Sequence, residues 1–501
     1  MNQSNTKITQ AGSGQQLHRE LGLRDLVPMQ ILLVVGVTWA GLAARQGPTH
    51  VVFWLLGIGT LFLPVAGVVH YCARIWPLEG GVYQWTKHAI GPFAGFLSAW
   101  NFAIWALLVV SNLGIVTAVS LSYALGPRAA WMASNAALIT SLNIGLFAFI
   151  LLVNIPGLGI GRWVAHFGTA VTLLVTALLI ILLVVHPHAS AAHPHVSPQP
   201  PFSLAFPVLT AMSLNLFSKF TFNSLTGLEQ VAVFAGETRN AGRAILCSAW
   251  IAAPIIAVIY IAMTGAMLTY TSADKIDLTG PIPQALAAAF GAARSGAGLD
   301  YGLMLGRAAI LALAIATVAQ YAVIIAETSR LPMVAAWDHL LPAWFTRLHP
   351  RYGTPTRSLT VIATLAVLLC LLASAGAGAQ EAFQLLVVSG NVCYGFNYLL
   401  MFAVPLVAGA RFGHRPGLLL RIGCICGIAV TLLQVVFSLI PVVGVSSSRA
   451  FGLKVGLSVL AANLAGAALY WRGVRVARAA NIGPNQCRGV GSGNGEGTSL
   501  I

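Results

Sequence analysis

Long apolar runs separated by short polar segments occupy most of this 501-residue chain. Charged residues make up only 8% of it, whereas a soluble domain carries about 25%. So few charges cannot cover the surface of a large globule in water, and lipid is the solvent that the sequence fits. A helix crosses the hydrocarbon layer in about 20 apolar residues, and the runs are about this long. They predict an all-α integral membrane protein.

The number of runs predicts about twelve transmembrane helices. The runs cover residues 26–44, 51–75, 92–124, 131–155, 162–185, 205–235, 245–271, 304–328, 357–375, 382–409, 417–443 and 452–471. Barrel strands do not fit, because the runs are too long and do not alternate polar and apolar residues. Residues 1–25 are polar, so we expect no cleavable signal peptide.

The formal net charge of +15 reflects orientation in the membrane. If the N-terminus is inside and the chain crosses twelve times, most of the 27 Lys and Arg fall in cytoplasmic segments, as the positive-inside rule requires. We therefore expect a multi-pass protein of the inner or plasma membrane with both termini in the cytoplasm. A nucleic-acid partner is not expected, because no basic cluster is interleaved with aromatic residues.

Polar and small residues interrupt the sixth run at 221–230, which reads TFNSLTGLEQ. Backbone groups freed by a break in a membrane helix must be satisfied internally or must line a cavity. Transporters use such discontinuous helices to bind substrate near the middle of the membrane. The break therefore predicts a substrate-binding site, although these residues could instead make helix–helix contacts. The candidates are Phe222, Asn223, Ser224, Leu225, Thr226 and Gly227.

The first run contains a similar interruption, VVGVTWAGLAA at 34–44. Runs one and six would each begin a five-helix half, which is the arrangement expected of an inverted repeat. The pattern predicts a 5+5 inverted repeat followed by two additional C-terminal helices. The candidate substrate-binding residues in the first run are Gly36, Thr38, Trp39, Ala40 and Gly41.

Ionisable groups inside the sixth run are candidates for coupling or gating, because charges at membrane depth are costly and are usually functional. Glu229 directly follows the break, and Lys219 precedes it by about two turns. The Lys219 ammonium could alternatively reach the external surface. Further gating candidates are Trp105 in the third run and Asn391 and Tyr394 in the tenth, with helix contacts as the alternative.

Glu327 and Arg330 lie three residues apart at the inner end of the eighth run. Side chains at this spacing are neighbours on a helix surface. The spacing favours an ion pair at the helix end over a role as substrate ligands.

Three segments, in the same order, resemble the amino acid–polyamine–organocation permeases, and the resemblance covers about residues 20–475. The sixth run and the segment after it, FNSLTGLEQVAVFAGETRNAGRAI (222–245), are similar to the family's sixth helix and its cytoplasmic signature. PLEGGVYQWTKHAIGPFAGFLSAW (77–100) resembles the family's loop before the third helix. SRLPMVAAWDHLLPAWFTRLHPRYGTP (329–355) resembles its eighth loop. The resemblance implies a leucine-transporter-like (LeuT-like) fold.

The resemblance also implies roles for the two breaks. The carboxylate of the substrate would meet backbone N–H groups around Thr38–Gly41, and its amino group would meet carbonyls near Asn223–Thr226. Glu229 matches the family's acidic residue beside the sixth-helix break, which is linked to proton coupling or gating. The first run departs from the family, because VTWAGL replaces a G-S-G run and brings Trp39 to the pocket.

These observations predict a secondary active transporter that moves amino acids or related amines by alternating access. Proton symport or exchange would drive it, since the eighth run shows no obvious Ser/Thr pair for sodium. The alternative is a nutrient sensor or receptor built on the same fold. The chain has no HExxH, GxSxG or P-loop motif, so we expect no enzyme, no catalytic or metal-binding residues and no cofactor.

The runs also predict the organisation of the chain. We expect a cytoplasmic N-terminal tail at 1–25, a first repeat at 26–185, an external His- and Pro-rich loop at 186–204, a second repeat at 205–409, two additional helices at 410–475 and a disordered cytoplasmic tail at 476–501.

Overall fold

A computed structural model describes residues 19–185, 201–291, 301–374, 379–411, 413–442 and 447–479. Most of the two predicted tails and of the predicted His- and Pro-rich loop therefore lies outside the described residues. Within the described part the protein is helical, and its one isolated β-bridge pairs Leu21 with Thr238.

The helices follow the order of the predicted runs, with several runs divided into shorter elements. The first half comprises α1 (Leu23–Val34), α2 (Val37–Ala44), η1 (Gly47–Thr49), α3 (His50–Gly57), η2 (Ile58–Phe62), α4 (Leu63–Ile75), α5 (Val82–Ala89), α6 (Pro92–Val110), α7 (Leu113–Leu125), η3 (Pro127–Ala133), α8 (Ala136–Asn154) and α9 (Leu158–Val185). The second half comprises α11 (Ala211–Leu225), η4 (Gln230–Glu237), α12 (Ala241–Tyr270), η5 (Ala273–Lys275), α13 (Pro281–Gly291), α14 (Tyr301–Thr328), α15 (Arg330–Trp337), η6 (Ala343–Thr346), α16 (Thr356–Ser374) and α17 (Ala379–Arg411). Two further helices, α18 (Leu418–Phe437) and α19 (Ser448–Ala479), end the described chain.

Nine helices among the described residues are long and apolar enough to cross a membrane. A tenth span forms if α1 and α2, which meet at a 50° bend, are counted as one broken helix. A shorter apolar helix lies at Thr356–Leu371, and the sixth run is divided between α11 and η4. The prediction of an all-α, multi-pass membrane protein is confirmed, whereas the count of twelve spans stays a prediction.

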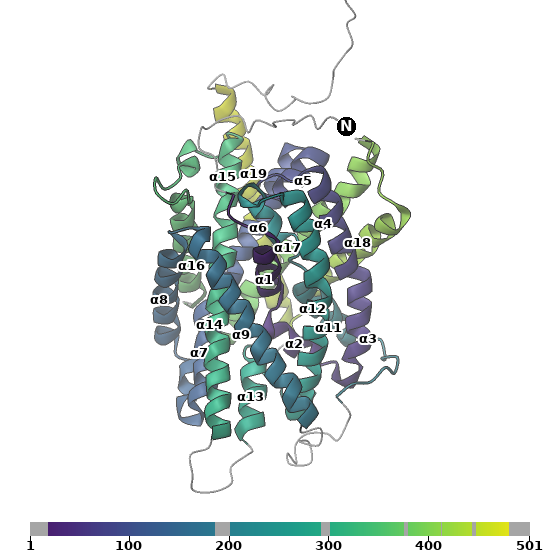
Figure 1. The fold of residues 1–501 in the computed structure, drawn as a ribbon, viewed down its shortest axis with the longest axis vertical. Coiled ribbons are helices and arrows are strands. Elements are labelled where there is room, and N and C mark those ends of the chain that lie inside the picture. The colour runs from purple at the N-terminus through teal and green to yellow at the C-terminus, as the bar shows by residue number, and fades with distance from the viewer. Residues whose placement is uncertain are drawn as a thin grey trace, which may run out of the picture.

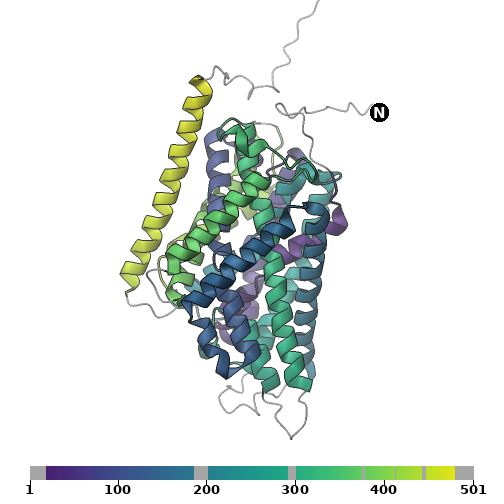
Figure 2. The same ribbon diagram turned by 90° about the vertical axis from the view of Figure 1, so that its left-hand side faces the viewer.

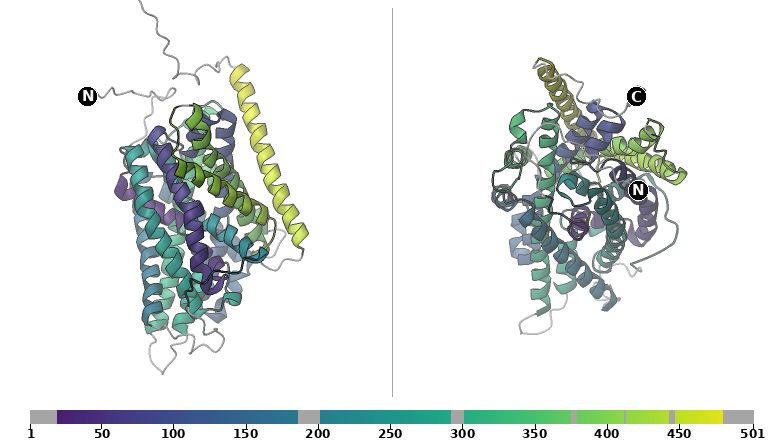
Figure 3. Two further views of the ribbon diagram at one scale, coloured as in Figure 1. Left: turned by 90° about the vertical axis from the view of Figure 1, so that its right-hand side faces the viewer. Right: turned by 45° about the horizontal axis from the view of Figure 1, so that its top comes forward.

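The two broken helices lie inside the bundle, where the other helices surround them (Figure 1). The half-helix α1 packs against α9 and α12, and α2 packs against α11 and α12. The last helix, α19, stands at the edge of the bundle and contacts α17 and α6 (Figures 2 and 3). Its outward side chains recur at helical spacing and are apolar, as a lipid-facing surface requires. They include Leu453, Leu457, Leu460 and Leu464.

The first break is a consequence of local sequence. Val35 and Gly36 are extended, and the indole of Trp39 folds back over Gly36, so that a Cβ on Gly36 would lie 2.6 Å from Trp39 Cδ1. The hydroxyl of Tyr260 on α12 accepts from Gly36 N–H (2.9 Å) and donates to the carbonyl of Val34 (2.7 Å). One side chain thus satisfies both a donor and an acceptor that the break removes from the helix ladder.

The sixth-run break has the same design. The Thr210–Ser213 capping box begins α11, and the helix ends before Thr226, which is extended. Gly227 follows at φ +109°, a conformation that favours glycine. Its N–H donates to the hydroxyl of Tyr398 on α17 at 2.7 Å. A tyrosine hydroxyl therefore meets a freed backbone group at each break.

Candidate substrate site between the two helix breaks

A cavity lies between the two breaks. It offers about 90 Å³ of space to the centres of water molecules, whereas one ordered water needs roughly 10–15 Å³ of such space. The cavity therefore has room for several waters or a small organic molecule. Its lining residues are Leu33, Val34, Gly36, Thr38, Trp39, Trp105, Val109, Val116, Asn223, Thr226, Gln230, Thr317, Gln320, Tyr321, Ile324, Val387, Asn391 and Tyr394.

The structure brings part of the predicted set to this cavity. The predicted residues that line it are Gly36, Thr38, Trp39, Trp105, Asn223, Thr226, Asn391 and Tyr394. The predicted residues that are not among its lining are Ala40, Gly41, Phe222, Ser224, Leu225, Gly227, Glu229 and Lys219. Gly41 instead faces Pro281 of α13, which a Cβ would meet at 2.5 Å. The rings of Phe222 and Tyr394 pack edge to face with centroids 6.0 Å apart.

One wall of the cavity comes from α14, which the sequence did not predict as part of the site. Thr317, Gln320, Tyr321 and Ile324 line it, and their spacing of three, one and three residues places them on one helix face. The sequence pattern that could have indicated this wall is a polar Thr and Gln at i and i+3 within an apolar run. The same pattern also marks ordinary helix contacts, so the sequence does not separate the two.

Glutamine amides meet further carbonyls freed at both breaks. Gln320 Nε2 donates to the carbonyl of Leu32 at 2.7 Å and lies 3.2 Å from that of Leu33. Gln30 Nε2 on α1 donates to the carbonyl of Leu228 in the other break at 2.6 Å. The C-terminal end of a helix carries partial negative charge, and in α1 a neutral amide donor fills the place where a cation would be stabilised.

Glu229 lies next to the cavity and is fully buried. Each carboxylate oxygen accepts a hydrogen bond from one tyrosine hydroxyl, Tyr394 to Oε1 and Tyr398 to Oε2. Gly227 N–H adds a weaker contact to Oε2 at 3.2 Å. The ring of Tyr394 also stacks on Trp105 with centroids 4.2 Å apart. Tyr394 is therefore the direct link between the cavity wall and Glu229.

Lys219 points away from the cavity. Its ammonium donates to the carbonyl of Ile440, just beyond the end of α18. That carbonyl lies at the end of the bundle predicted to be external, although the Lys219 side chain is only 6% exposed. The direction agrees with the alternative in which this ammonium extends toward the external surface.

The charge of the cavity is the property that bears most on its ligand. Among the described residues, its polar lining consists of hydroxyls and carboxamides, and no acidic or basic side chain takes part. Two indoles and two phenols supply aromatic surface. The cavity therefore offers hydrogen bonds and apolar contacts without a fixed ionic partner.

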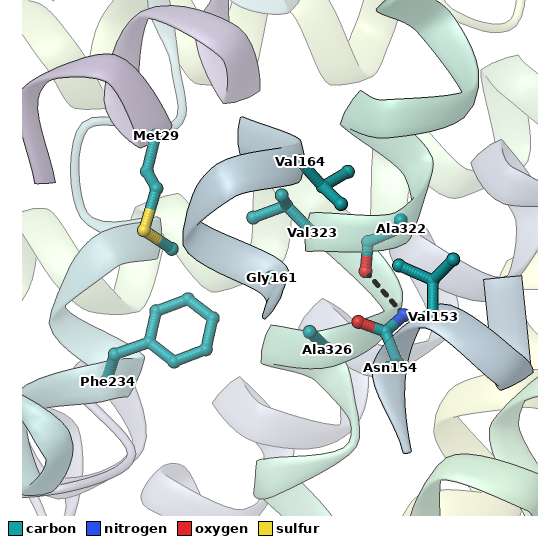
Figure 4. Close-up of a pocket in the computed structure, with 9 residues that line it drawn as sticks. All are labelled: Met29, Val153, Asn154, Gly161, Val164, Phe234, Ala322, Val323 and Ala326. Atoms are coloured by element: carbon teal, nitrogen blue, oxygen red, sulfur yellow. Dashed lines mark hydrogen bonds between the residues drawn. The ribbon is translucent and has the colours of Figure 1, made fainter. Parts of the chain in front are cut away.

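A second, smaller cavity lies between α1, α8, α9, η4 and α14 (Figure 4). It offers about 10 Å³ to water centres, enough for one water at most. Met29 and Phe234 face it on one side, and Asn154, whose Nδ2 donates to the carbonyl of Ala322 at 3.0 Å, lies on the other. These five elements therefore lie close together around the cavity.

Polar contacts close the end of the bundle predicted to be cytoplasmic. Arg330 Nε and Nη2 donate to the two carboxylate oxygens of Glu237 at 2.9 and 3.1 Å, and both side chains are buried. Leu21 N–H donates to the carbonyl of Glu237 at 3.0 Å, and Arg239 N–H donates to that of Leu21 at 2.9 Å. The predicted Glu327–Arg330 ion pair is wrong, because Arg330 is committed to a partner 93 residues away.

Glu79, in the connection between α4 and α5, lies beside this closure. Its Oε2 accepts from Gly236 N–H at 2.5 Å. Burial raises the pKa of the Glu79 carboxyl well above its ordinary value, and the neighbouring Glu237 raises it further, while Arg330 acts in the opposite direction. The closed end therefore contains two carboxyl groups and one guanidinium.

A helical bundle with two interrupted helices around a small polar cavity defines a membrane transporter with the LeuT-like fold. A sequence profile of the amino acid permease family matches residues 21–460. The chain belongs to this family. Its solved structural neighbours include MhsT in complex with L-phenylalanine, at a TM-score of 0.57 and 13% identity, covering 89% of this chain and 100% of MhsT. This likeness shows the shared fold.

Curated relatives are transporters. The chain is 26% identical over 360 residues to an uncharacterised transporter of Legionella pneumophila, covering 70% of this chain and 74% of the relative. It is 25% identical to the glutamate/serine transporter AimA of Bacillus subtilis, covering 69% and 64% of the two chains. It is 26% identical to the low-affinity putrescine importer PlaP of Escherichia coli K12, covering 70% and 72%.

Proposed function

We propose that this protein is a secondary active transporter that carries a neutral amino acid through the central cavity by alternating access. The observation that carries the proposal is the uncharged, hydrogen-bonding cavity between two helix breaks. A dibasic substrate would need a carboxylate in the wall, and an acidic one would need a guanidinium or ammonium. The described part of the wall offers neither, whereas its indoles and phenols suit an apolar or small polar side chain.

Proton coupling through Glu229 is the second part of the proposal. Glu229 is buried, hydrogen-bonded to a residue of the cavity wall and located beside the sixth-run break. A change in substrate occupancy that moves Tyr394 would change the donors of Glu229, and with them its affinity for a proton. The protein would lie in the inner or plasma membrane with both termini in the cytoplasm. Opening of the cytoplasmic end would break the contacts of Leu21 and Arg330 with Glu237.

Uptake into proteoliposomes tests both parts. Purified protein would be offered radiolabelled amino acids and polyamines, with and without an inward proton gradient, as wild type and as Glu229→Gln. We expect gradient-driven uptake of a neutral amino acid in the wild type and its loss in the variant, with protein-free liposomes as the control. Accumulation of a polyamine instead would contradict the substrate class. Binding without flux under every gradient would favour a sensor.

A further inference from the structure

Glu327, in the last turn of α14, is a buried carboxyl group without a hydrogen-bond donor. Its side chain is fully buried, and neither Oε1 nor Oε2 has a partner among the described residues. Glu229 and Glu237, by contrast, receive donors at both oxygens. Glu327 does not line the substrate cavity, so substrate contact does not account for it.

An ionised carboxylate in this position would be very costly. Burying a charge without a partner loses its solvation and gains no compensating interaction. Glu229 is among the charged groups that act on Glu327, and a second negative charge nearby adds to the cost. The environment therefore accommodates Glu327 in its neutral, protonated form.

Arg330 is the other charged group that acts on Glu327, and it is one helical turn away in sequence. Its Nη1 donates to the carbonyl of Ala326, which places the guanidinium beside the turn that carries Glu327. Its Nε and Nη2 donate to Glu237 on η4. Arg330 thus lies near the carboxyl groups of both Glu237 and Glu327. In the closed conformation it binds Glu237.

The elements that pack against α14 carry other charged groups, and several of these have partners of their own. They are Arg24 and Asp25 on α1, Arg162 and His166 on α9, Glu237 on η4 and Arg357 on α16. His166 Nε2, for example, lies 3.1 Å from Asp25 Oδ1. Among the described residues, the charged groups that act on Glu327 are Glu229 and Arg330. An exchange of partner by Arg330 would therefore change the environment of Glu327.

We propose that Glu327 is a second proton-carrying residue, and that it releases its proton when Arg330 transfers from Glu237 to Glu327 as the cytoplasmic end opens. In this step the O–H bond of the Glu327 carboxyl breaks, the proton passes to water that enters from the cytoplasm, and the guanidinium compensates the new carboxylate. Glu237 becomes solvated at the open end. The inference rests on the proposed proton-coupled transport and adds a residue that ties proton release to opening.

Infrared difference spectroscopy tests the partner exchange directly. Wild-type protein should show the carbonyl stretch of a protonated carboxyl that is absent from Glu327→Gln. In Glu237→Gln the arginine loses its anionic partner, so the same band should disappear although Glu327 is unchanged. A band that persists at full strength in Glu237→Gln overturns the exchange. A wild-type spectrum identical to that of Glu327→Gln overturns the protonated state.

Transport assays separate this inference from the proposed function. For each proton carried, a gradient of one pH unit supports about a tenfold higher limit of substrate accumulation. Glu327→Gln should therefore lower the accumulation ratio about tenfold at that gradient, while substrate counterflow without a gradient is retained. Unchanged accumulation in this variant contradicts the inference. Absence of both uptake and counterflow in the wild type would instead overturn the proposed function.

Discussion

At the scale of single residues, four buried glutamates differ in the donors that surround them. Glu229 receives two hydroxyls and a weaker N–H contact, Glu237 receives a guanidinium and Glu79 receives one N–H group. Glu327 receives no donor from the residues that the structure describes. Since donors decide whether a buried carboxylate can hold its charge, the same residue type serves different purposes here. The position of Glu229 beside a break could be predicted from the sequence. Its hydrogen-bond donors could not, because Tyr394 and Tyr398 come from α17, more than 160 residues away.

Tyr398→Phe tests the support of Glu229. The substitution removes one donor to the carboxylate and the acceptor of Gly227 N–H while it keeps the ring. Hydrogen bonds to charged groups are worth about 1.5–3 kcal/mol, so we expect the initial rate of gradient-driven uptake to fall by about tenfold or more. Tyr352→Phe, in an exposed loop, is the matched control and should transport normally. An unchanged rate in Tyr398→Phe would show that Tyr394 alone suffices.

Glu79→Gln tests the pH response of the closed end. Because the pKa of Glu79 in the folded protein lies above its ordinary value of 4.5, its contribution to stability is fully present below 4.5 and is lost as pH rises through the folded pKa. Because glutamine does not titrate, the Glu79→Gln variant does not lose stability in this way as pH rises. We expect its melting temperature to match the wild type near pH 4.5 and to exceed it by a few degrees at neutral pH. A constant difference at all pH values would refute the assignment to this carboxyl.

At the scale of elements, the breaks were predictable and their surroundings were not. Gly36 and Gly227, each with polar neighbours inside an apolar run, marked the interruptions because local sequence sets where a helix stops. The contribution of α14 to the cavity wall could not be predicted, because Thr317 and Gln320 have the same sequence pattern as ordinary helix contacts. The partner of Arg330 was assigned wrongly because helical spacing reports neighbours on one helix, whereas the tertiary fold supplied Glu237.

Gly227→Ala tests the geometry of the sixth-run break. At φ +109° a Cβ is strained, and it would also approach Val34 Cγ2 to 3.2 Å. Backbone strain of this kind costs about 1–3 kcal/mol, so we expect a lower melting temperature and slower uptake. Gly145→Ala, on α8, has open space around the new Cβ and should leave both unchanged or raise stability slightly. Equal effects of the two substitutions would contradict the role of the break.

At the scale of the whole molecule, the first described residues and the end of α19 lie at the same end of the bundle (Figure 3). The family profile ends at residue 460, inside α19, and this helix contributes nothing to the cavity lining. The arrangement is consistent with an even number of crossings.

Thiol labelling assigns the two ends. Ser134→Cys lies exposed just before α8, and Arg351→Cys lies exposed between α15 and α16. An impermeant maleimide added to intact cells should label the first variant and spare the second, and permeabilised cells should label both. Wild-type protein gives the background from the native cysteines. The reverse pattern would invert the proposed orientation.

The amide of Gln320 at the end of α1 has a consequence for energetics. A sodium ion bound to the carbonyls of Leu32 and Leu33, which Gln320 occupies, would dissociate on the other side of the membrane. Its movement down the sodium gradient would then provide energy for transport. Gln320 supplies stabilising hydrogen bonds at the same place but is tethered to the backbone. Because the Gln320 amide stays bound to these carbonyls throughout the transport cycle, it stabilises the broken helix but provides no energy for transport. That energy must come from an ion or substrate that binds on one side of the membrane and dissociates on the other.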